Sequence, residues 1–221
     1  MHRTAWLAAI LCMAVSLLGC PSNATHLRPE LQAAADTRDA VAVSDALEQL
    51  IDEQKATEAD REAAYEAVKR FEEDSAEYAF ARAALAGRLA QVRGLSAIGL
   101  VDEAERYARL SRERDPNFRE GAATRMLGTL YVLAPASLVE HGDSETGLEL
   151  LEELLDKQPE LLENRLRVAE AYVALDDPDP AFEHLCLCLK RRSELRPDAQ
   201  RLLLQIVDDA GGLQELGCES E

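Results

Sequence analysis

Aromatic and cationic residues are scarce in this 221-residue sequence. Aromatics make up 5% of the chain, and 24 lysines and arginines face 42 aspartates and glutamates, which gives a formal charge of −18. Nucleic acids and anionic membranes both attract proteins through lysine and arginine, so this balance argues against either as the main partner. The hydrophobic share of 47% is nevertheless large enough for a folded core, which excludes a disordered acidic chain.

Long apolar runs are also absent. No run reaches the roughly 20 residues that a membrane-spanning helix needs. The longest extends from Ala5 to Leu18, is broken only by Ser16, and follows a short polar and basic start. Its 14 residues have the length of a signal-peptide core, so we expect residues 1–19 to be a signal peptide.

The apolar run ends in Leu17-Leu18-Gly19-Cys20, which resembles the lipobox of bacterial lipoproteins. The resemblance implies a covalent lipid on Cys20 as the only non-protein group, with residues 20–35 as anchor and tether and no other hold on the membrane. No Asp follows Cys20, which by resemblance to the sorting pattern of some bacteria favours the outer membrane, facing the periplasm. The alternative is an ordinary secretory signal in which the position of Cys20 is coincidental.

Three cysteines follow Cys20, namely Cys186, Cys188 and Cys218. Cys186 and Cys188 are two apart in a helical pattern, so their side chains point to nearly opposite sides and should not pair. A bridge from Cys218 to one of them is an alternative. Buried free thiols are the favoured interpretation, because cysteine behaves as a small apolar residue. No His or Cys cluster completes the four ligands of a metal site.

Apolar residues recur at helical spacing in segment after segment, and no run alternates as a strand does. The stripes begin near Val43, and Gly211-Gly212 ends the last of them. Most breaks are short and carry Asp-Pro, Gln-Pro or Gly, so consecutive helices must pack antiparallel. The sequence therefore predicts an all-α fold of about nine helices, with a helical-repeat domain over residues 36–215.

Three units along the chain share the spacing of a tetratricopeptide repeat. In that 34-residue pattern a Gly precedes an Ala by five residues, and the closing Pro follows twelve residues later. Gly99, Ala104 and Pro116 keep both intervals. The next unit opens with Leu127-Gly128-x-x-Tyr131, and a third with Ala169-x-x-Tyr172. The chain thus resembles a tetratricopeptide-like array of helical hairpins, an α-solenoid.

A narrower resemblance comes from the second and third units. The stretch Gly121-x6-Gly128-x-x-Tyr131-x3-Pro135, then Gly142-Asp143, then Pro159-x4-Asn164-x4-Ala169-Glu170-x-Tyr172 is similar to the T-component family of TRAP transporters, called TatT. The resemblance implies a lipid-anchored helical-repeat protein that associates with a periplasmic solute-binding subunit. It also implies a homotrimer with an axial pore.

No catalytic constellation stands out in the sequence. His26 lies in the predicted tether, His141 in an insertion between two helices, and His184 beside an apolar stripe. None has a partner at metal-ligand or catalytic-triad spacing. Neither a Gly-x-Ser-x-Gly elbow nor a Gly-rich phosphate loop occurs. We therefore expect no enzyme and no metal.

The insertion, from Ala134 to Asp143, is longer than a tetratricopeptide turn needs. Packing alone accounts for it if Asp143 or Ser144 caps the next helix and the rest is a tolerated insertion. The alternative is a partner or ligand surface, because long ordered loops often carry function. The candidate binding residues are Tyr131, Pro135, His141, Asp143, Asn164 and Tyr172.

The function predicted first is a periplasm-facing lipoprotein with a tetratricopeptide-like binding scaffold, a TatT-like accessory partner of a TRAP solute-binding protein. The alternative is a general tetratricopeptide lipoprotein that helps to assemble an envelope protein complex. A third class is a small-molecule carrier with an apolar pocket between repeats. The repeat positions alone do not separate these classes, because they serve packing whatever the protein binds.

Overall fold

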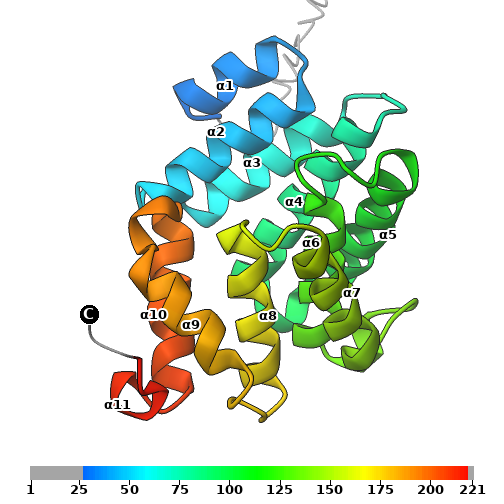
Figure 1. Cartoon of the computed structure of the whole chain (residues 1–221). Helices are drawn as coiled ribbons and strands as arrows, with labels where there is room; N and C mark the ends of the chain where they lie inside the picture. Colours follow the sequence, from blue (N-terminus) through cyan, green and yellow to red (C-terminus); the bar gives the residue numbers. More distant parts are fainter. Residues whose placement is uncertain (1–26, 219–221) are drawn as a thin grey trace, which may run out of the picture.

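The computed structural model describes residues 27–218 (Figure 1). This part of the chain holds eleven α-helices and no strand, which confirms the all-α fold. The helices are α1 (Pro29–Asp36), α2 (Ala40–Asp52), α3 (Glu58–Lys69), α4 (Ala76–Arg93), α5 (Ile98–Arg114), α6 (Ala122–Leu133), α7 (Ser144–Lys157), α8 (Leu162–Ala174), α9 (Ala181–Lys190), α10 (Pro197–Asp209) and α11 (Leu213–Leu216). The predicted signal peptide, Cys20 and the first part of the predicted tether lie outside the described residues. Within them, no helix is both long and apolar enough to span a bilayer.

The count exceeds the predicted nine because two short helices, α1 and α11, carry too few turns for a clear apolar stripe. Leu31 of α1 is fully buried in the same apolar cluster as α2 and α3. Arg28, just before α1, donates to both carboxylate oxygens of Asp60 in α3, at 3.0 and 3.1 Å. Residues 27–35 of the predicted tether, residues 20–35, therefore belong to the folded body: Leu27 and Arg28 contact it, and residues 29–35 lie in α1.

Three helical hairpins, α4–α5, α6–α7 and α8–α9, lie side by side as an array (Figure 1). Each hairpin buries one face against the next, as in helical repeat proteins. The α2–α3 pair crosses one end of the array, and α10 with α11 covers α8 and α9. Apolar clusters follow the same order: one joins α1 to α5, two smaller ones join α4 to α7 and α7 to α8, and the last joins α8 to α11.

A disulfide between Cys186 and Cys218 ties the C-terminal segment after α11 to α9, with 5.4 Å between the two Cα atoms. The prediction of free thiols is therefore wrong for these two cysteines, because the turn at Gly211-Gly212 folds α11 back onto α9. It is confirmed for Cys188, which is fully buried and unpaired. Burial raises the pKa of the Cys188 thiol to about 11, so the group stays protonated.

Gly128 of α6 and Gly147 of α7 let these two helices approach closely. A Cβ atom added to Gly128 would lie 2.6 Å from Cγ of Leu151 and 2.9 Å from the carbonyl oxygen of Gly147. A Cβ atom added to Gly147 would lie 2.7 Å from the carbonyl oxygen of Gly128. Backbone lies against backbone here, so no rotamer change could make room for a side chain.

Gly128→Ala should therefore lower the free energy of unfolding by about 1–3 kcal/mol, the usual cost of overpacking a tight contact. Gly87→Ala in α4 is the matched control, because a Cβ atom at Gly87 meets nothing within 4 Å. At this position an alanine lowers the conformational entropy of the unfolded chain, which should raise the free energy of unfolding by about 0.5–1 kcal/mol. Urea unfolding measures both variants, and equal effects would show that the α6–α7 contact is not tight.

Candidate functional site

The segment between α6 and α7 forms an ordered loop that contains a short 3₁₀ turn, Ala136–Leu138. Pro135, Ala136 and Ser137 expose their side chains, whereas Leu138 and Val139 are partly buried. The segment from Leu133 to Val139 carries no charge, in a chain whose residues are 30% charged. The inserted loop, residues 134–143, therefore presents an uncharged stretch up to Val139, which is followed by the exposed Glu140, His141 and Asp143.

A buried carboxylate on α5 holds the inserted loop in place. Glu105 is 2% exposed and accepts the backbone N–H groups of Glu140 and His141, each at 2.8 Å, one on each carboxylate oxygen. Burial raises the pKa of Glu105, but the two N–H groups and the Tyr131 hydroxyl outweigh it and hold the pKa below its usual value. The loop is thus fixed to the neighbouring hairpin by a charged acceptor with satisfied hydrogen bonds.

Tyr131 lies beneath the loop and not on a free surface. Its ring is 4% exposed, and its hydroxyl donates to Glu105 at 3.1 Å. Burial and the adjacent Glu105 carboxylate raise the pKa of Tyr131 to about 12. Gly142 lies directly against the ring, where a Cβ atom would collide with it. Tyr131 therefore supports the loop from below.

The other three loop candidates lie at the surface. Asp143 caps α7 by accepting the N–H of Thr146 at 2.8 Å, and this bond lowers the pKa of Asp143. The side chain of His141 is 42% exposed, with Nδ1 3.3 Å from a carboxylate oxygen of Glu105. Pro135 is exposed at the start of the 3₁₀ turn. Of these, Pro135 and His141 are free to meet a partner.

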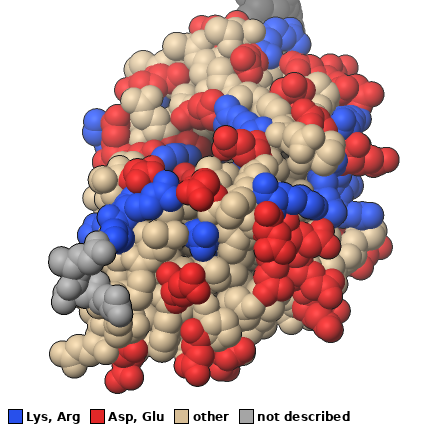
Figure 2. All heavy atoms as spheres, viewed as in Figure 1, with Lys and Arg blue, Asp and Glu red and all other residues tan. Residues whose placement is uncertain are grey.

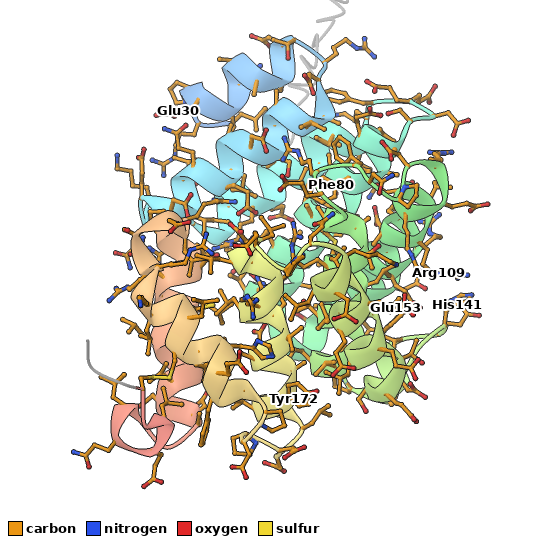
Figure 3. All side chains as sticks on the ribbon, viewed as in Figure 1. Glu30, Phe80, Arg109, His141, Glu153 and Tyr172 are labelled. Atoms are coloured by element: carbon orange, nitrogen blue, oxygen red, sulfur yellow. A yellow bond between two sulfur atoms is a disulfide. The ribbon has the colours of Figure 1, made fainter. Side chains whose placement is uncertain are left out.

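Asn164 and Tyr172, both on α8, lie apart from the loop. Asn164 is 1% exposed; it accepts from Arg125 of α6 at 2.7 Å and donates to the carbonyl of Leu154 at 3.4 Å. Tyr172 donates its hydroxyl to Glu152 of α7, which raises the pKa of Tyr172 to about 12. In Figure 3, Tyr172 and His141 are well separated across the molecule. The six predicted residues therefore do not form one site.

Two buried charged side chains, Glu105 and Arg82, hold parts of the structure together, and the sequence patterns did not identify them. Glu105 follows Ala104 in a stripe of small residues, and nothing in the sequence marks it as buried. Arg82 is 5% exposed; it pairs with Glu103, donates to the Tyr78 hydroxyl at 3.1 Å, and lies 4.6 Å from the Tyr107 ring centroid. Its position four residues after Tyr78 places it on the buried face of α4, and that spacing is the signal that could have found it.

Besides His141, the described residues hold one histidine, His184, and many carboxylates. Among them, no three His, Cys, Asp or Glu side chains are placed to hold a metal ion. His184 lies 3.4 Å from Arg165, and burial, then the charge of Arg165, lowers its pKa. Comparison with protein-family models gives no match, and comparison with curated proteins gives none either. The site is therefore interpreted from its geometry.

Glu105→Gln should loosen the inserted loop. A glutamine can accept one of the two N–H groups but presents its own N–H₂ to the other, so about 2–3 kcal/mol of unfolding free energy should be lost at pH 7. Because the folded pKa is lowered, the contribution of Glu105 is present above the ordinary pKa of about 4.3 and is lost as the pH falls through the folded value. The difference between variant and wild type should therefore shrink in acid.

Urea unfolding of both proteins across this pH range measures the effect. The control is Glu113→Gln, which removes an exposed carboxylate from the same helix and should change stability by less than about 0.5 kcal/mol. A pH-independent difference between Glu105→Gln and wild type would contradict the assignment of Glu105 as a charged anchor.

Proposed function

We propose that this chain is a lipid-anchored scaffold protein that faces the periplasm and binds another protein, as a TatT-like accessory partner of a TRAP solute-binding protein. The observation that carries the proposal is the inserted loop. It is uncharged and exposed at Pro135, Ala136 and Ser137, yet anchored to α5 through Glu105. A pre-ordered exposed loop on a rigid array loses little entropy on binding, which favours recognition of a folded partner.

The residues that resemble the T-component family support only part of this proposal. Tyr131, Asn164 and Tyr172 all make hydrogen bonds inside the array. Positions of this kind serve packing in any helical repeat, so they support the fold of the T-component more than its partner. The proposed partner therefore depends on the exposed loop residues Pro135, Ala136 and Ser137.

A second candidate function is a general envelope scaffold that binds basic protein segments. The outer surface of α7 favours it, because aspartate and glutamate side chains gather there (Figure 2), around Glu153 in Figure 3. Glu145, Glu149 and Asp156 on the same helix are exposed. Such a surface attracts Lys- and Arg-rich segments over a distance that salt shortens.

Pull-down of the full-length protein from crosslinked membranes, with Ser137→Lys as the variant, tests the choice. Placing a charged side chain in the uncharged stretch of the loop should lower recovery of a solute-binding protein about tenfold, which corresponds to ~1.4 kcal/mol of binding free energy. Ala174→Lys is the matched control, because Ala174 is exposed at the end of α8, the corresponding helix of the next hairpin.

Equal recovery with both variants would contradict a role for the inserted loop. Recovery of envelope-assembly proteins in place of a solute-binding protein, with loss in high salt, would favour the second candidate function.

A further inference from the structure

The last turn of α2 and the first turn of α10 cap each other, although some 146 residues separate them. The N–H of Asp198, in the first turn of α10, donates to the carboxylate of Asp52 at 3.0 Å. In return, Arg201 of α10 donates to the carbonyl oxygens of Ile51 at 2.8 Å and of Asp52 at 3.2 Å. Each helix thus supplies partners for backbone groups that its neighbour cannot satisfy within its own helix.

Ion pairs surround this reciprocal cap. Arg88 of α4 donates to both carboxylate oxygens of Glu48, each at 2.7 Å, and to Asp198 at 3.0 Å. Arg196 donates to Asp52 at 2.9 Å and to Glu48 at 3.0 Å. Burial alone would raise the pKa of Glu48, but Arg88 and Arg196 hold it below its usual value. Figure 1 shows the start of α10 beside the end of α2, where the two ends of the array meet.

This contact differs from every other one around the array because no apolar cluster crosses it. Neighbouring apolar clusters elsewhere share a helix, whereas the cluster of α1 to α5 and that of α8 to α11 share none. We call Glu48, Asp52, Arg88, Arg196, Asp198 and Arg201 the polar latch. Burial of apolar surface holds the hairpins together cooperatively. In the polar latch, the side chains of Arg196 and Arg201 are 48% and 34% exposed, so salt weakens their ion pairs, whereas it screens the more buried Arg88–Glu48 pair less.

Arg61 lies beside the polar latch. Its Nη1 donates to the carbonyl oxygen of Arg88 at 3.2 Å, and its Nε is buried without a hydrogen-bond partner among the described residues. Burial, and then the charge of Arg88, lower the pKa of Arg61. Four guanidinium groups therefore lie at this contact with three carboxylates, and Arg61 is the one whose positive charge is disfavoured there.

We propose that the polar latch is a salt-sensitive closure that opens while the apolar clusters on both sides stay folded. Opening separates the start of α10 from α2 and α4 and exposes Arg88, Glu48 and Asp198 to solvent. The closed form is the one described here, in which these groups satisfy each other. The proposal is independent of the function proposed above, because it concerns the array itself.

Hydrogen exchange of the full-length protein, followed by mass spectrometry of peptides, tests the proposal. Asp52→Asn removes the charge that both Arg196 and the Asp198 N–H contact. An Asn oxygen can still accept the Asp198 N–H, so the first turn of α10 should exchange about two- to fivefold faster, the effect expected for loss of the charge paired with Arg196. Raising sodium chloride from roughly 0.05 to 0.5 M should have the same effect on the wild type.

Asp45→Asn is the matched control. Asp45 is also on α2 and forms an ion pair, with Arg119 outside the polar latch, at 2.6 Å. It should leave exchange in α10 unchanged. Arg196→Gln removes the charge that pairs with Asp52 and Glu48, from the α10 side of the polar latch. This second variant replaces Asp52→Asn in the test if Asp52→Asn folds poorly.

Two results would overturn the proposal. In one, α10 exchanges at the same rate in wild type, in both latch variants and at both salt concentrations. In the other, hydrogen exchange in α4 and α8 accelerates together with that in α10, which would show that the contact opens only when the whole fold opens.

Discussion

The close approach of α6 and α7 at Gly128 and Gly147 is the contact on which the middle of the array depends. Because the two backbones touch, Tyr131 can lie flat beneath the inserted loop, and Gly142 can pack on its ring. The loop then passes over α5, where Glu105 accepts the N–H groups of Glu140 and His141. A side chain at either glycine would push the helices apart and remove the base on which the exposed loop residues rest.

Apolar burial reaches both ends of the array, but the ends also carry polar and covalent contacts. Apolar clusters continue from hairpin to hairpin, as a helical repeat requires. At the ends, the Arg28–Asp60 ion pair ties α1 to α3, the Cys186–Cys218 disulfide ties the C-terminus to α9, and the polar latch joins α10 to α2. The middle therefore supplies a rigid platform, while the ends carry the contacts that salt or a reductant can alter.

Helical periodicity and short breaks were sufficient to predict the all-α array, because stripes such as Tyr78, Leu85 and Leu89 record burial directly. Periodicity could not predict α1 and α11, whose burial depends on neighbours distant in sequence. Asn164 and Tyr172 were predicted as binding residues, but their positions reflect packing between helices. Glu105 and Arg82 were missed because the sequence shows charge and spacing but not which carboxylate meets a backbone loop or which arginine lies between tyrosines.

We propose that the inserted loop contacts a folded protein in the periplasm. Replacing Ser137 by a photo-crosslinking amino acid in the full-length protein, and irradiating intact cells, tests this contact where it occurs. A crosslinked product with a periplasmic solute-binding protein is expected from position 137, and none is expected from the same replacement at Ala174. Crosslinks to lipid alone, or the same products from both positions, would contradict it.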